Sequence, residues 1–116
     1  MNRITEHITS WLDDPANNAI EPDSTLRAFS KPLIGFASGD DALFDCIKAD
    51  IGSEFYWTPV EAFSLAFPDE SVRAGELSVI AWILPQTDHT RMAHRKAETM
   101  PSIEWSRARH YGEKVN

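Results

Sequence analysis

The strongest constraint on the fold of this chain is a run of nine uncharged residues, LSVIAWILP at 77–85. Apolar side chains fill both faces of this run apart from Ser78, which predicts a central strand over 77–84 that is covered on both sides. Pro85 ends the strand, because proline has no backbone N–H to give to a sheet. A buried strand that stops at a proline and opens into a polar loop often forms the floor of a binding site. The residues after Pro85 are therefore the first candidates for a binding site.

Hydrophobic periodicity and turn signals divide the rest of the chain into short elements. Apolar residues at helical spacing predict helices, and the apolar run LIGFA, which follows Pro32, predicts a second strand. The expected elements are helices at 4–13, 41–51, 58–67, about 89–98 and from 102 onward, with strands at 33–37 and 77–84.

Several of these helices begin with side chains that can cap free backbone N–H groups. The clearest signal is TPVE at 58–61, where Thr58 is the expected N-cap and Glu61 completes a capping box. Thr87 or Asp88 is expected to cap the helix at 89–98, and Ser102 the last helix. These caps fix where the helices start more firmly than the apolar pattern does.

The helix at 41–51 has a clear apolar face and a short polar lead-in. Either Ser38 or Asp40 is the expected N-cap, and Gly52 is the expected C-terminal stop. Cys46 lies between apolar neighbours and close to two aspartates, so we expect a buried, unreactive thiol. The apolar face consists of Leu43, Phe44, Ile47 and Ile51.

Together the elements predict a single α+β domain with a small mixed sheet, whose central apolar strand at about 77–84 is covered by short helices. Residues 1–14 form the expected N-terminal helix. Residues 15–31 are linker-like, because they contain two prolines and show no periodicity. Residues 32–116 form the expected core.

Two strands are fewer than a self-contained sheet usually has. The segments 19–29 and 53–57 are the candidates for a third strand. The chain is expected to be the N-terminal part of a larger fold, or a protomer that completes its sheet through a partner.

The net charge of −7 is unevenly distributed. Residues 1–85 carry 14 acids against 5 Lys and Arg residues, whereas residues 86–116 carry 4 acids against 6. The acidic part argues against binding of nucleic acid by the whole domain. The basic tail is either a solvated helix surface or a contact for a phosphate or an acidic partner.

Cysteine usage and hydropathy favour a cytoplasmic location. Cys46 is the single cysteine, so the chain forms no internal disulfide and has no Cys-x-x-Cys metal motif. The N-terminus MNRITEHITSWLDD lacks the apolar centre of a signal peptide. No apolar stretch approaches the roughly 20 residues of a membrane helix.

Few residues are arranged for chemistry. Asp40 and Asp41 either hold a metal or act as a general base, or they cap the following helix, which is the expected role. His89 and His94 are five residues apart, which on a helix directs them about 140° from each other, so no shared metal ion is expected.

The remaining candidate is a binding surface formed by the loop after Pro85 and the last helix. Its basic side chains can contact phosphate or carboxylate groups, and its tryptophan can stack on a planar ligand. The candidate ligand-binding residues are Gln86, His89, Arg91, Trp105 and Arg109.

Three stretches of the chain match a known pattern in order and spacing. They are PLIGFASGDDALFDCIKADIG at 32–52, LSVIAWILPQT at 77–87 and PSIEWSRARHYGEKVN at 101–116. They resemble the N-terminal region of epoxyqueuosine-reductase-like iron–sulfur proteins, in which a VGFA-x-x-DD-x-LF segment precedes an apolar strand ending in Leu-Pro and an EWA-type helix. The resemblance covers about residues 32–116.

This resemblance implies an α+β N-terminal region of a reductase family linked to cobalamin and 4Fe–4S clusters. In that family a Cys-rich, ferredoxin-like part follows and holds the clusters. The cluster cysteines are absent here, so the resemblance transfers no reductase activity and no catalytic residue to this chain. Cobalamin or clusters are expected only in a larger family context, and no cofactor is expected on this chain.

The sequence therefore predicts a non-catalytic domain that shapes a ligand pocket or a partner surface. The alternative is a stand-alone protein-interaction or dimerisation module without a ligand. An enzyme in its own right is the least expected class, because no nucleophile–base pair is visible. The expected partner is a second copy of the chain or a missing C-terminal cluster domain.

Overall fold

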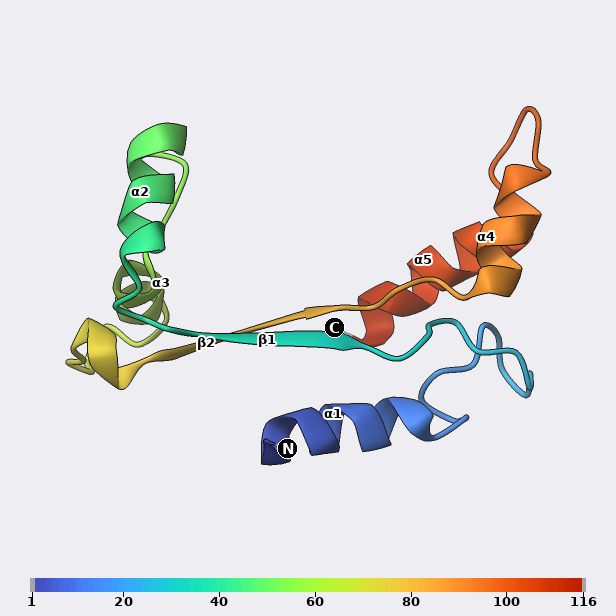
Figure 1. Cartoon of the computed structure of the whole chain (residues 1–116), viewed down its shortest axis with the longest axis horizontal. Helices are drawn as coiled ribbons and strands as arrows, with labels where there is room; N and C mark the ends of the chain where they lie inside the picture. Colours follow the sequence, from blue (N-terminus) through green and yellow to red (C-terminus); the bar gives the residue numbers. More distant parts are fainter. Residues whose placement is uncertain (1, 116) are drawn as a thin grey trace. The chain divides into compact units, whose positions relative to one another are not determined.

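The computed structural model describes residues 2–115 as five α-helices, one short 3₁₀ helix and a two-stranded sheet (Figure 1). The α+β class predicted from the sequence is confirmed. Within residues 2–115, no helix has both the length and the apolar character needed to cross a membrane. In chain order the elements are α1 (Arg3–Asp13), β1 (Leu33–Ser38), α2 (Ala42–Ile51), α3 (Pro59–Ala66), the 3₁₀ helix η1 (Ala74–Glu76), β2 (Ser78–Ile83), α4 (Asp88–Arg95) and α5 (Ile103–Val115).

The sheet is an antiparallel pair of β1 and β2 (Figure 1). Each strand has the other as its single strand partner within residues 2–115, so the expected central, doubly covered strand at 77–84 is not formed. The segment 53–57 is a turn followed by coil, and 19–29 contributes only isolated bridges. Trp82 and Ile83, at the end of the apolar run, are exposed. An apolar run therefore does not by itself show that a strand is covered on both faces.

The chain divides into two compact units, which are described separately. Of the described residues, unit 1 comprises 2–34 and 82–115, and unit 2 comprises 35–81. The boundaries fall within β1 and β2, so the chain passes from one unit to the other twice. This division does not coincide with the expected boundary between a linker-like 15–31 and a core at 32–116.

The core of unit 1 comes largely from the segment expected to be linker-like. Ile20, Ala28 and Phe29 of this segment are buried together with Ala108 of α5. Their side chains reach the core from turns and bridges rather than from a regular element, so they show no periodicity in the sequence. The partly buried side chains packed against them are Leu84, Tyr111 and Val115.

Asn18 is the polar centre of unit 1. Its side chain is almost fully buried, and its Nδ2 donates to the backbone oxygens of Leu12 and Phe29 at 3.0 and 2.9 Å. Its Oδ1 accepts from the Phe29 N–H at 2.9 Å, and its backbone oxygen accepts from the Ala28 N–H at 2.8 Å. These bonds attach the C-terminal end of α1 to the segment that carries the core residues.

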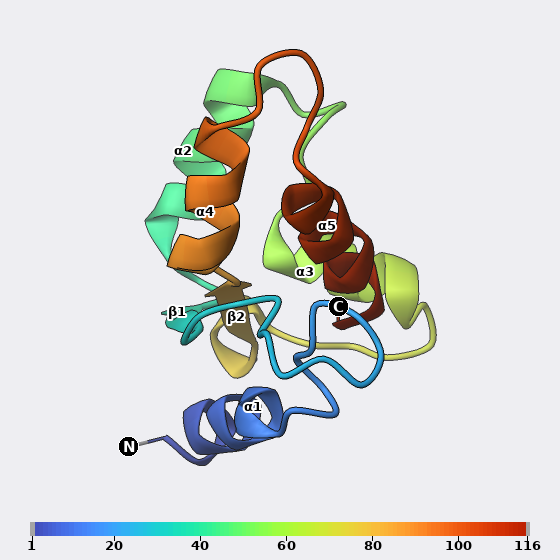
Figure 2. The same cartoon turned by 90° about the vertical axis from the view of Figure 1, so that its right-hand side faces the viewer.

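The C-terminal part of unit 1 is an antiparallel hairpin of α4 and α5 (Figure 2). Thr87 caps α4 by accepting from the Thr90 N–H, and Ser102 Oγ accepts from the Trp105 N–H at the start of α5, as the sequence predicted. Thr90 and Ala108 are fully buried. α4 ends at Arg95, three residues earlier than expected.

Unit 2 contains α2 and α3 and shows the expected capping box. Thr58 Oγ1 accepts from the Glu61 N–H, and the Glu61 carboxylate accepts from the Thr58 N–H at 2.8 Å. The prediction for α2 was wrong by one residue, because the helix starts at Ala42 and its N-cap is Asp41, not Ser38 or Asp40. Gly52 ends α2 with a φ of 110°, as expected of a C-terminal glycine.

No side chain of unit 2 is fully buried. Among residues 35–81, all of which the structure describes, Gly39 alone is buried. The predicted apolar face of α2 is correspondingly open: Phe44 is half-buried, whereas Leu43, Ile47 and Ile51 are exposed. The amphipathic pattern located the apolar side of the helix, but the other residues of unit 2 do not cover it.

Asn18→Ala tests the account of unit 1. The change leaves the Phe29 N–H and two carbonyl oxygens without their partner, so we expect the free energy of unfolding to fall by about 3 kcal/mol. The matched control is Asn17→Ala, which removes one hydrogen bond, to the Trp11 oxygen, at a more exposed site and should cost less than about 1 kcal/mol. Chemical denaturation measures both, and equal losses would contradict the role given to Asn18.

Candidate functional site

Three of the five predicted ligand-binding residues lie together in unit 1. Gln86, Trp105 and Arg109 line a hollow of about 430 Å³ between the end of β2 and α5. The hollow therefore combines a large aromatic surface with an amide and a guanidinium group. The other lining residues are Phe29, Trp82, Leu84, Ala108, Gly112 and Glu113.

Trp105 contacts two neighbouring side chains through its ring. The imidazole ring of His94 stacks on it with centroids 5.3 Å apart and planes 19° apart. The Arg109 guanidinium carbon lies 5.7 Å from the centroid of the Trp105 ring, within the range of a cation–π interaction. The sequence indicates His94 only as a possible metal ligand, and nothing in it predicts this stacking.

The other two predicted residues do not join the hollow. His89 and Arg91 are exposed on α4 and are absent from its lining. The Arg91 guanidinium forms an ion pair with Asp88, its neighbour on the same helix. Both residues were predicted from their closeness in sequence to Pro85, which does not determine the direction in which a helical side chain points.

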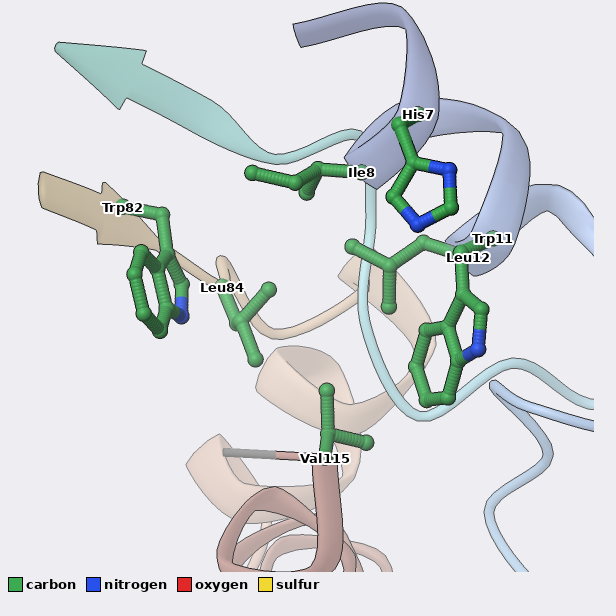
Figure 3. Close-up of a pocket in the computed structure, with 7 residues that line it drawn as sticks. All are labelled: His7, Ile8, Trp11, Leu12, Trp82, Leu84 and Val115. Carbon is green, nitrogen blue, oxygen red and sulfur yellow. The ribbon is translucent and has the colours of Figure 1, made fainter. Parts of the chain in front are cut away.

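A second hollow of unit 1 was not predicted (Figure 3). Its volume is about 250 Å³ and its lining is mostly apolar. α1 forms one side, Trp82 and Leu84 form the opposite side, and Val115 closes it from α5 (Figure 3). The α1 residues are His7, Ile8, Trp11 and Leu12. The signal was present in the sequence as the apolar stripe of the helix at 4–13, but nothing in the sequence indicated what α1 packs against.

Unit 2 has a hollow of its own, of about 430 Å³. Phe44 of α2, Phe63 of α3 and Leu77 before β2 contribute to it, and the other lining residues are Tyr56, Trp57, Pro59, Ala62, Ser78 and Val79. Large exposed side chains surround this region: Trp57 is 62% exposed and Phe55 is 81% exposed. Unit 2 thus combines a shallow aromatic hollow with a wider apolar surface.

The polar residues considered for chemistry have structural roles or are solvated. Asp41 caps α2, and Asp40 accepts a hydrogen bond from the Ser38 hydroxyl. Cys46 is exposed, so the expectation of a buried thiol was wrong; it lies on the solvent side of α2, away from Phe44. Residues 2–115 contain no group of three or more His, Cys, Asp or Glu side chains that could hold a metal ion.

The clear pKa shifts belong to two capping interactions in unit 2. The Lys48 ammonium donates to the Glu61 carboxylate, and together with the Thr58 N–H it lowers the pKa of Glu61 from the ordinary value of 4.5. In the same way, the hydrogen bond between Arg73 and Glu76 lowers the pKa of Glu76 and raises that of Arg73. Both pairs stabilise local structure at helix starts.

Comparison with known proteins gives no relative for this chain. No family model matches it, and neither does any curated protein or solved structure.

Glu61→Gln tests the origin of the lowered pKa. Since the folded pKa of Glu61 lies below its unfolded value, its contribution to stability is present above about pH 4.5 and is lost as the pH falls through the lowered pKa. The variant should be less stable than the wild type at neutral pH and lose less stability on acidification. Denaturation from about pH 7 to about pH 3 measures this. The control is Glu70→Gln, which removes a carboxylate that has no ion-pair partner among residues 2–115; identical profiles for the two variants would contradict the assignment.

Proposed function

We propose that this chain is a protein-interaction module that binds its partner through the apolar face of unit 2. The observation that supports this most strongly is that unit 2 buries none of its side chains fully. A folded segment normally gains its stability from a buried core. Large apolar side chains that stay together on a surface mark sites where another molecule binds.

The binding face consists of a helix stripe and an aromatic hollow. Leu43, Ile47 and Ile51 follow one another at intervals of four residues along α2, so they form one stripe. Phe44 lies beside this stripe on the helix and lines the hollow of unit 2. Aromatic and branched apolar side chains in such an arrangement are typical of the central residues of protein interfaces.

A second candidate function is a ligand pocket around Trp105 in unit 1. The convergence of Gln86, Trp105 and Arg109 favours it, since an aromatic ring beside a guanidinium suits a planar or anionic ligand. The resemblance to epoxyqueuosine-reductase-like proteins suggests cobalamin as the first ligand to examine, and the single cysteine suggests a cytoplasmic setting.

Cobalamin should then raise the melting temperature of the chain, and Arg109→Ala should remove the effect; no response to cobalamin would contradict this family role.

Selection of binding peptides tests the proposed interaction module. Random peptides displayed on phage are selected on the intact chain, and enriched peptides are then measured in solution. We expect the double variant Leu43→Ser, Ile51→Ser to weaken their binding by about tenfold or more, because it removes two of the three apolar side chains of the stripe. The control is Leu26→Ser, which changes an exposed leucine of unit 1 and should have no effect.

Two results would contradict the proposal. One is that no peptide is enriched. The other is that the enriched peptides bind the double variant as well as the wild type. Thermal unfolding of each variant shows whether the fold is retained, which is expected because both substituted side chains are more than half exposed.

A further inference from the structure

We infer that the partner of unit 2 presents a basic amphipathic helix to it. This inference rests on the proposed function and adds the chemistry of the partner. It is carried by two properties of unit 2 that occur together, an uncovered apolar stripe and a strong excess of negative charge.

The apolar part of unit 2 combines the stripe on α2 with the hollow beside it. The stripe on α2 continues toward Phe55, whose ring lies against Gly52 at the end of the helix. Next to the stripe, Phe44 leads into the hollow shared with Phe63 of α3. A helix with apolar residues at i, i+3, i+4 and i+7 can place them along such a stripe and into the hollow beside it.

The charge of unit 2 accounts for the whole net charge of the chain. Residues 35–81 contain nine acids and two bases, a net charge of −7, which equals that of the full sequence. Both bases are already engaged, because Lys48 pairs with Glu61 and Arg73 with Glu76. The other seven acids form no ion pair with any residue in 2–115: Asp40, Asp41, Asp45, Asp50, Glu54, Asp69 and Glu70.

Some of these carboxylates lie beside the apolar face. At 100° per residue, Asp50 lies one turn beyond Ile47 and about 60° from it around α2, at the edge of the stripe, and Glu54 directly precedes Phe55. Lysine or arginine side chains that flank the apolar residues of a bound helix would therefore meet carboxylates at the rim. Such exposed pairs add little affinity individually, but they select a basic partner and speed its association.

The same charge disfavours a second copy of the chain as the occupant. A two-fold symmetric contact through this face would bring two units of net charge −7 together. Like charges at an interface are destabilising. The excess charge is therefore better matched by a positively charged partner than by self-association.

Three synthetic helical peptides test this inference on the intact chain. The first carries leucines at i, i+3, i+4 and i+7 with lysines and arginines elsewhere. The second replaces the basic residues with glutamates, and the third has the composition of the first with the leucines scrambled. Fluorescence anisotropy of the labelled peptides gives the dissociation constants. Sedimentation velocity gives the oligomeric state of the chain alone.

We expect the first peptide to bind about tenfold or more tightly than either of the others, because both the charge and the apolar spacing contribute. The variant Leu43→Ser, Ile51→Ser should weaken its binding by a similar factor, and Leu26→Ser should not. The variant Asp50→Asn, Glu54→Gln should weaken binding less and reduce its dependence on salt. The chain alone should sediment as a monomer.

Other outcomes overturn the inference in distinguishable ways. If the scrambled peptide binds equally well, the contact is unspecific charge attraction. If the acidic peptide binds equally well, unit 2 remains an interaction surface but its partner is not selected by charge. A dimer that Leu43→Ser, Ile51→Ser abolishes would identify a second copy as the occupant. If none of the peptides binds and phage selection also fails, the proposed function fails as well.

Discussion

Unit 2 leaves its apolar surface uncovered, and this limits how far burial can stabilise it. Burial of apolar side chains is the main favourable contribution to folding, and unit 2 obtains only half-burial for its best-placed aromatic residues. Its local structure depends on polar features instead: Asp41 at the start of α2, the capping box at Thr58 and the Lys48–Glu61 pair. These features fix helix ends, but each is worth little compared with a core. A partner that covers the face would supply the missing burial.

Unit 1 forms a buried core from its own residues. Asn18 satisfies backbone groups of two separate segments, and this allows Ile20 and Phe29 to pack against Ala108. The hollows that remain beside Trp82 are lined by side chains from α1, the end of β2 and α5. The two units therefore differ in what they offer to other molecules. Unit 1 has a small core with pockets at its edge, and unit 2 has a surface that resembles half of an interface.

The sequence predicted local structure well and burial poorly. The helices at 4–13, 41–51 and 58–67 and both strands were located because caps, prolines and periodicity act over a few residues. The core residues Ile20 and Phe29 were missed, because they reach the interior from irregular turns. The pattern located the apolar stripe on α2 but did not indicate its exposure, because an apolar face has the same pattern whether it is covered or not. Three of the predicted site residues, Gln86, Trp105 and Arg109, line one hollow. His89 and Arg91 do not line it, because the packing of α4 sets the direction of their side chains and the neighbouring sequence does not show that packing.

Native-state hydrogen exchange measures most directly whether unit 2 depends on a partner for its burial. In the free chain we expect amides of unit 1 such as Ala28, which donates to Asn18, to exchange about tenfold or more slowly than helical amides of α2 and α3, because exposed local structure opens more easily. Saturation with a peptide that binds unit 2 should slow exchange in α2 and α3 and leave unit 1 unchanged. Equal protection of the two units in the free chain would contradict the account, because unit 2 would then be stable without a partner.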